Sequence, residues 1–242
     1  MEYLMLLCIL ALAFLYASVG HGGASGYLAI MTIMGFEPHV MRSSALMLNV
    51  FVSGIAFIQY YRKGFFQWRI FLPFALASIP MAFLGGRISP DIFVYKKILG
   101  VCLIFAVIRL LGFFGKDRDT LKPLPVIAGL IAGAVLGFVS GMVGIGGGII
   151  LSPVILLFHW ARMKTTAAVS ALFIFVNSIG GLGGLWSSGN LEAAGKIYLW
   201  AGVAVLGGIL GGYVGSSKVT NKGLKYVLAF VLIFASVKLL FL

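Results

Sequence analysis

The chain alternates long apolar runs with short polar connections over almost its whole length. The apolar runs cover residues 4–19, 24–36, 45–61, 70–86, 98–114, 124–143, 147–160, 167–186, 197–215 and 224–242. About 20 apolar residues span a bilayer as a helix, and a helix satisfies its own backbone polar groups in lipid. Most runs therefore predict membrane-spanning helices. The runs 24–36 and 147–160 are too short to span, and they predict half-helices, short packed helices or re-entrant segments.

Composition supports an integral membrane protein. Apolar residues make up 61% of the 242, charged residues only 10%, and the mean hydropathy is +1.11. A soluble fold of this length could not bury so much apolar surface. The first run is interpreted as a retained helix rather than a signal peptide, because no basic residue precedes it. Cys8 and Cys102 lie inside apolar runs, which predicts two small apolar side chains rather than a disulfide or a metal site.

The sequence contains an internal repeat. The segment Val19-Gly20-His21-Gly22-Gly23-Ala24 is followed 124 residues later by Val143-Gly144-Ile145-Gly146-Gly147-Gly148. Three further pairs keep the same order, with an offset that drifts to 129: Ser44-Ala45-Leu46 with Ser170-Ala171-Leu172, Leu84-Gly85-Gly86 with Leu210-Gly211-Gly212, and Leu103-Ile104-Phe105-Ala106 with Leu232-Ile233-Phe234-Ala235. We therefore expect one transmembrane domain built of two homologous repeats, residues 1–115 and 116–242.

The distribution of Lys and Arg favours inverted repeats over parallel ones. Inversion places eleven basic residues on one face and five on the other, whereas parallel halves give seven and nine. Because cytoplasmic loops are rich in Lys and Arg, the hydrophilic segment 115–125 is expected in the cytoplasm and both termini outside. Arg109 and Lys238 lie near the ends of matching runs and are expected to extend to the membrane interface. The net charge of +12 fits loops near anionic lipids and does not require a nucleic acid.

Paired glycines outside the repeated motif predict close helix packing. Gly207 and Gly211 are four residues apart, as are Gly208 and Gly212. Small residues at this spacing let helix backbones approach closely.

The repeated glycine motif predicts an anion site. Glycines at the start of a helix leave backbone N–H groups unobstructed, and the helix dipole adds partial positive charge there. Such helix starts bind anions. Two inverted copies would bring these N–H groups together near the bilayer midplane. The alternative is that the glycines only permit tight helix crossing.

Candidate substrate-binding residues come from the two motifs and from the polar positions of the third run in each repeat. They are Gly20, His21, Gly22, Gly23, Ser25, Ser43, Ser44, Asn49, Gly144, Gly146, Gly147, Gly148, Ser170 and Asn177. Each side chain also has a structural interpretation. Ser43 and Thr166 are expected to cap helix starts, and the two asparagines could instead join helices. Arg42 is the one cation that could reach an anion from a loop, although an interfacial role is favoured. His21 is either satisfied by a carbonyl or acts as a proton donor or anion ligand.

Enzyme chemistry is not indicated. The six acidic residues fall at termini, run edges or loops, and we find no nucleophile–base pair, carboxylate pair, metal-ligand cluster or nucleotide loop. We expect no catalytic residues, no metal and no cofactor. Without a buried carboxylate relay, transport would be driven by the gradient of the solute and by voltage, or coupled through His21.

The glycine motifs, the Ser-Ala-Leu segments and the basic stretch from Tyr60 to Arg69 resemble the TauE/SafE sulfite exporter family over essentially the full length. The resemblance implies a permease for sulfite, thiosulfate or organosulfonates, with the paired glycine motifs as its signature region. The expected partners are a small anionic solute, membrane lipids and, in one arrangement, a second copy in a homodimer. The expected location is a bacterial inner membrane. An anion channel and a non-catalytic membrane subunit of a larger complex remain the alternatives.

Overall fold

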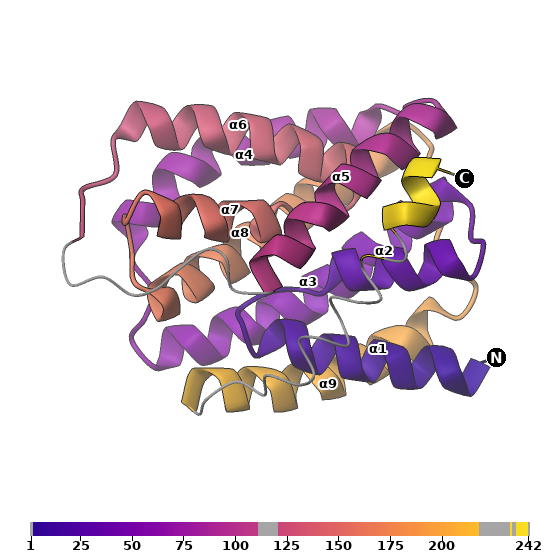
Figure 1. Cartoon of the computed structure of the whole chain (residues 1–242), viewed down its shortest axis with the longest axis horizontal. Helices are drawn as coiled ribbons and strands as arrows, with labels where there is room; N and C mark the ends of the chain where they lie inside the picture. Colours follow the sequence, from indigo (N-terminus) through magenta and orange to yellow (C-terminus); the bar gives the residue numbers. More distant parts are fainter. Residues whose placement is uncertain (1, 111–120, 218–232, 234–235, 242) are drawn as a thin grey trace.

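The computed structural model describes residues 2–110, 121–217, 233 and 236–241, and within these ranges it is helical with no strand (Figure 1). Nine helices follow one another: α1 (Glu2–Ala17), α2 (Ala24–Ile33), α3 (Pro38–Arg62), α4 (Trp68–Arg87), α5 (Ile92–Leu110), α6 (Val126–Val143), α7 (Gly148–Leu157), α8 (Met163–Ser187) and α9 (Ile197–Ser217). Residues 236–241 are also helical. The helices α3, α4, α6, α8 and α9 are long and apolar enough to cross a membrane, while α1, α2 and α7 are shorter apolar helices.

The two short apolar runs form short helices, as predicted. Both α2 and α7 have ten residues, and each directly follows a glycine motif. They are too short to cross a bilayer alone. The long helices α3 and α8 follow them, with 25 residues each.

Helices α3 and α8 begin earlier in the sequence than the apolar runs 45–61 and 167–186. Helix α3 begins at Pro38, seven residues before the apolar run, and α8 begins at Met163. Proline suits the first turn of a helix because the N–H it lacks would be unpaired there. Polar residues of these first turns pack against protein, so hydropathy does not mark them. Ser43 and Thr166 therefore lie inside helices, and the prediction that they cap helix starts is wrong.

Each of the two repeats packs its first helix on the fourth helix of the other. The backbones of α6 and α4 approach through glycines at every fourth position of α6, namely Gly129, Gly133, Gly137 and Gly141. Helix α9 approaches α1 in the same way through Gly207, Gly211 and Gly215, which face the backbone of Leu10, Phe14 and Ser18. Small residues at this spacing allow close contact. The predicted packing role of Gly207 and Gly211 is confirmed.

Helices α3 and α8 cross in the centre and run in opposite directions. Leu46 lies beside Gly181, while Gly54, two turns further along α3, lies beside Phe175. Their buried positions match at an offset of 125: Leu48, Asn49, Val52 and Ser53 in α3, and Phe173, Ile174, Asn177 and Ser178 in α8. Asn49 and Ile174 thus occupy equivalent positions.

Charged side chains near the helix ends form contacts that link different parts of the bundle. The Glu2 carboxylate accepts from Lys196 Nζ at 2.6 Å, which joins the starts of α1 and α9. Lys238 Nζ donates to the carbonyl of Thr32 at 2.8 Å, at the end of α2. The corresponding prediction for the Arg109 side chain lies outside the described residues. Neither cysteine forms a disulfide: Cys102 is buried, as expected, and Cys8 is partly buried.

Candidate functional site

Two glycine-rich loops lie inside the protein, one in each repeat. Residues 18–23 connect α1 to α2, and residues 144–147 connect α6 to α7. Both loops are buried except for partial exposure at Val19. Gly23 and Gly147, the residues before α2 and α7, have φ angles of +94° and +74°. Because glycine adopts such angles without steric cost, the chain can enter each short helix through a tight turn.

The two loops meet between the central helices α3 and α8. A Cβ atom built on Gly22 of the first loop would collide with the Asn49 amide and contact Ile174. A Cβ on Gly146 of the second loop would meet the same two side chains, at 2.6 Å from Asn49 Nδ2 and 2.8 Å from Ile174 Cγ2. Since Asn49 and Ile174 are equivalent positions, the loops of both repeats converge on one place.

Asn49 joins the two loops by hydrogen bonds. Its Oδ1 accepts from the N–H of Ala24 at 3.0 Å, and its Nδ2 donates to the carbonyl of Ile145 at 3.1 Å. The interpretation of Asn49 as a helix-joining amide is confirmed. Asn177 differs, because its Nδ2 donates at 2.7 Å to the carbonyl of Phe173 in its own helix.

His21 is buried, with 1% of its surface exposed. Its Nδ1 lies 2.8 Å from the carbonyl of Val19, and its Nε2 lies 3.0 Å from the carbonyl of Gly148 and 3.1 Å from Ser152 Oγ. A carbonyl only accepts hydrogen bonds, so a ring protonated on both nitrogens satisfies both carbonyl contacts. Ser152 Oγ in turn lies 2.7 Å from Ser170 Oγ. The carbonyl-satisfied interpretation of His21 is confirmed by the contacts of its ring nitrogens with the carbonyls of Val19 and Gly148.

Several backbone N–H groups of the loops have no acceptor within the described part of the chain. They belong to Gly22 and Gly23 in the first loop and to Ile145, Gly146, Gly147 and Gly148 in the second. The first helical amides of any helix lack an intrahelical partner, and the helix dipole makes this end positive. These N–H groups could therefore donate hydrogen bonds to an anion.

Hydroxyl groups of the second repeat lie beside its loop without a partner. Ser140 and Ser178 are buried, and neither Oγ has a hydrogen-bond partner. A Cβ built on Gly146 would lie 3.2 Å from Ser178 Oγ, and one on Gly147 would lie 3.3 Å from Ser140 Cβ. Thr166 Oγ1 and Asn177 Oδ1 are also buried and unpaired.

Sequence reasoning missed Ser140, Ser152 and Ser178. One signal was available, because Ser178 repeats Ser53 at the offset of 125. Ser140 stands four residues before Gly144, on the last turn of α6, and only the fold brings it to the loop.

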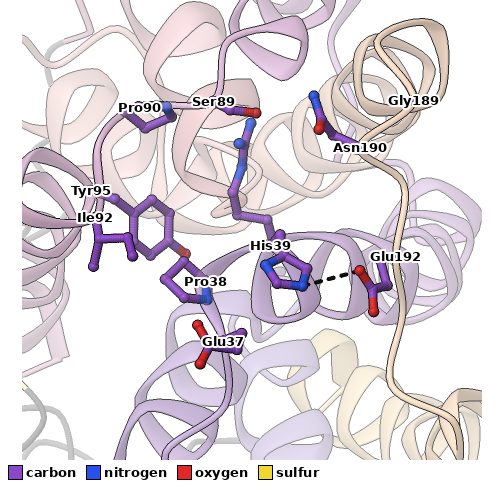
Figure 2. Close-up of a pocket in the computed structure, with 11 residues that line it drawn as sticks. Glu37, Pro38, His39, Ser89, Pro90, Ile92, Tyr95, Gly189, Asn190 and Glu192 are labelled. Carbon is purple, nitrogen blue, oxygen red and sulfur yellow. Dashed lines mark ion pairs between the residues drawn. The ribbon is translucent and has the colours of Figure 1, made fainter.

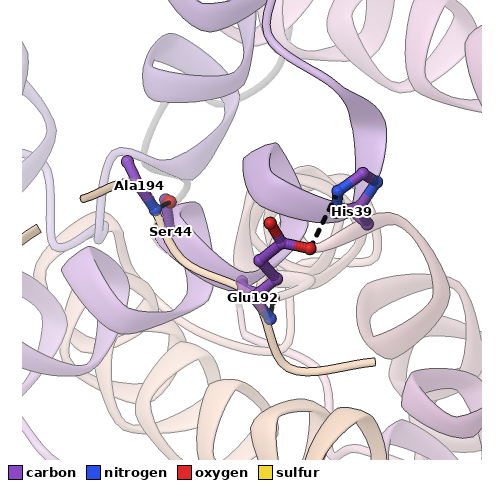
Figure 3. Close-up of polar contacts among 5 residues, drawn as sticks. His39, Ser44, Glu192 and Ala194 are labelled. Atoms are coloured by element: carbon purple, nitrogen blue, oxygen red, sulfur yellow. Dashed lines mark hydrogen bonds and ion pairs between the residues drawn. The ribbon is translucent and has the colours of Figure 1, made fainter. Parts of the chain in front are cut away.

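Two candidate residues, Ser43 and Ser44, bind the connection between α8 and α9. Ser43 Oγ accepts from the N–H of Glu192 at 3.2 Å, and Ser44 Oγ accepts from the N–H of Ala194 at 2.9 Å. His39 Nε2 lies 3.1 Å from a carboxylate oxygen of Glu192 (Figure 3). The first two turns of α3 therefore hold this connection in place. Ser25 of the first repeat is also paired, through Tyr16.

Arg42 is buried between helices, with 3% of its surface exposed. Its guanidinium donates to four main-chain carbonyls at 3.0–3.4 Å, those of Gly85, Gly86, Ile88 and Gly141. These carbonyls lie at the C-terminal parts of α4 and α6, where the helix dipole is negative. Arg42 thus ties α3 to both helices, and the close glycine contacts around it exclude lipid.

Arg42 also lines a pocket of about 380 Å³ at one end of the bundle (Figure 2). The pocket lies between the start of α3, the α4–α5 connection and the α8–α9 connection. Its other polar lining residues are Glu37, His39, Ser89, Tyr95, Asn190 and Glu192. The pocket carries both charge signs, because the Glu37 and Glu192 carboxylates line it together with Arg42 and His39.

The five long apolar helices in the described part of the chain define a multi-pass membrane protein. The family model of the sulfite exporter TauE/SafE matches residues 5–239, and the chain belongs to this family. It is 38% identical over 237 residues to the probable membrane transporter protein y4hK of Sinorhizobium fredii, covering 96% of this chain and 94% of the relative.

More distant relatives carry similar names. A probable membrane transporter protein ORF9 of a Sinorhizobium species is 28% identical, with 87% of this chain and 80% of the relative covered. One from Haemophilus influenzae is 28% identical, with 76% and 73% covered. No solved structure shows a significant match.

Proposed function

We propose that this transporter carries a small sulfur-containing anion, such as sulfite, thiosulfate or an organosulfonate, and binds it between the two glycine loops. The observation that carries the proposal is that Gly22 and Gly146, one from each loop, both adjoin the buried Asn49, while N–H groups of both loops have no acceptor among the described residues. The family name points to sulfite as a substrate of relatives. Unpaired N–H groups at two helix starts supply the donors that an oxyanion needs when it leaves water.

The repeats are proposed to be inverted and to bind the anion at the membrane midplane. One packing feature supports inversion: α3 runs opposite to its counterpart α8. The reciprocal packing of α1 on α9 and of α6 on α4 supports a two-fold relation between the repeats. Both loops are buried, so a solute reaches them only after helices move. Rocking of one repeat against the other would open the site to each face in turn.

Inversion predicts that the α3–α4 and α8–α9 connections lie on opposite faces of the membrane. We expect Gln67→Cys and Leu191→Cys, each in a background without Cys8 and Cys102, to react with a membrane-impermeant thiol reagent from opposite sides. Both positions are exposed. Labelling of both from the same side would contradict inversion and support parallel repeats.

Export of an anion needs no buried carboxylate relay. Among the described acidic residues none is buried, and each negative charge leaving a cell at 100 mV, inside negative, gains about 2.3 kcal/mol. His21 is the titratable side chain within the loops, and its protonated ring would add positive charge beside the bound anion. Proton binding at His21 is therefore the proposed source of any pH dependence.

His21→Gln is expected to flatten the pH dependence of transport between about pH 5 and 8, the range in which histidine charge changes. Glutamine keeps one donor and one acceptor but does not titrate. The measurement is anion flux into proteoliposomes at a series of pH values. His159→Gln, at a residue outside the loops, is the control and should keep the wild-type profile. A His21→Gln profile that matches wild type would return His21 to a structural role.

The proposed function is tested by anion-dependent stabilisation of the purified protein. A ligand that binds only the folded state raises the melting temperature. We expect sulfite, thiosulfate or a simple sulfonate to raise it more than chloride or a neutral solute at equal ionic strength. Saturable flux of the same anion would separate a carrier from a channel. Equal melting curves with every anion would contradict the proposal.

A further inference from the structure

The two glycine loops differ in how far their surroundings are satisfied. In the first repeat, Asn49 accepts from Ala24, the Ser25 and Tyr16 hydroxyls lie 2.6 Å apart, and the Tyr60 hydroxyl donates to the Ser18 carbonyl at 2.9 Å. The second loop has two unpaired hydroxyls beside it and a run of four unpaired N–H groups. The first loop is not fully satisfied, because the buried Tyr27 hydroxyl beside Gly23 also lacks a partner. The second loop nevertheless has more unpaired donors than the first.

The contrast is sharpest at two equivalent serines. Ser53 of α3 donates to the carbonyl of Asn49, four residues earlier in its helix, at 2.6 Å. This is the usual way in which a serine inside a helix satisfies its hydroxyl. Ser178 of α8 has the same burial and the same place in the repeat, but its hydroxyl has no partner. Its Oγ lies beside Gly146.

A buried hydroxyl without a partner is costly and calls for an explanation. Ser178 adjoins the N–H groups of Gly146, and Ser140 approaches Gly147 from α6. The unpaired hydroxyls of Ser140 in α6 and Ser178 in α8, together with the N–H groups of Gly146 and Gly147, are neutral donors on residues that adjoin the second loop or belong to it. Such a set of donors can form hydrogen bonds with an anion that has several acceptor oxygens.

We infer that Ser140 and Ser178 are the side-chain ligands of the transported anion, and that the second loop takes it while the first loop supports it. The inference rests on the proposed function and makes it more specific. The ligand class is a small oxyanion with three oxygens on one sulfur, as in sulfite or a sulfonate, because its oxygens can accept from both hydroxyls and both N–H groups. A halide is a single atom, so it can accept fewer hydrogen bonds from donors that lie apart and should bind more weakly.

The test uses the purified full-length protein with three alanine variants, Ser140→Ala, Ser178→Ala and Ser53→Ala. Without anion, Ser140→Ala and Ser178→Ala should melt at or above the wild-type temperature, since neither hydroxyl has a protein partner. Ser53→Ala should melt lower. The Kd for sulfite and for methanesulfonate should rise about tenfold in Ser140→Ala and in Ser178→Ala, the value of one hydrogen bond to a charged group. It should change less than twofold in Ser53→Ala, and a chloride Kd should change little in all three.

Two outcomes separate this inference from the proposed function. If the anions stabilise the wild type and bind Ser178→Ala and Ser140→Ala equally well, the assigned ligands are wrong while the loop site stands. If none of the anions binds the wild type, the proposed function is contradicted, and the assignment fails with it.

Discussion

Alanine at Gly146 is expected to abolish anion binding and to reduce transport at least 100-fold. A Cβ there would lie 2.6 Å from Asn49 Nδ2, 2.8 Å from Ile174 Cγ2 and 3.2 Å from Ser178 Oγ. It would therefore fill the place where the loops converge. The measurement is sulfite flux into proteoliposomes, together with the melting temperature with and without sulfite.

A second variant separates the effect of backbone strain in Gly146→Ala from the effect of its side-chain contacts. Gly146 has φ +80°, and an alanine in this region costs about 1–2 kcal/mol. Gly64 has φ +75° with nothing near its Cβ position. Gly64→Ala should therefore carry similar strain and keep wild-type transport. Near-normal flux in Gly146→Ala would show that the loop contact is not part of the anion path.

Leucine at Asn49 is expected to lower the free energy of unfolding by about 2–6 kcal/mol, because two buried main-chain groups lose their partner at about 1–3 kcal/mol each. These are the N–H of Ala24 and the carbonyl of Ile145. Leucine keeps the side-chain volume, so the loss reports the hydrogen bonds. The measurement is reversible unfolding in mixed detergent micelles.

The matched control is Asn177→Leu. Asn177 donates only to its own helix, where the Phe173 carbonyl keeps its helical partner, so the loss of stability should be smaller. Transport should also fall more in Asn49→Leu than in Asn177→Leu. An Asn49→Leu protein as stable as wild type would contradict the role of this amide as the link between the loops.

Much of the fold could be predicted from local sequence. Apolar runs marked the spans, the repeated glycine motif marked the two short helices, and the spacing of Gly207 and Gly211 marked a close helix contact. Each of these signals acts within one helix or one loop. That is why hydropathy and small-residue spacing were sufficient.

The helix starts and the side-chain partners could not be predicted in this way. Pro38 begins α3 among residues polar enough to resemble a loop. Arg42 is buried because carbonyls from α4 and α6, 43 to 99 residues away in sequence, reach its guanidinium. Such partners become visible only when the helices are assembled.

The Ser-Ala-Leu match aligns the two repeats with an error of one residue along α3 and α8. The Ser-Ala-Leu match implies an offset of 126, whereas the buried faces of α3 and α8 match at 125. The offset of 125 makes Asn49 equivalent to Ile174 and Ser53 equivalent to Ser178. Burial decides the alignment here because composition alone is too uniform in an apolar helix.

The most direct measurement is an anomalous-scattering map of crystals of the protein soaked with selenite, a heavier analogue of sulfite. We expect one selenium peak between α3 and α8, placed so that selenite oxygens accept from the N–H groups of Gly146 and Gly147. The peak should vanish in Gly146→Ala crystals. A peak confined to the Arg42 pocket, with the loops empty while selenite is transported, would contradict anion binding by the paired glycine loops.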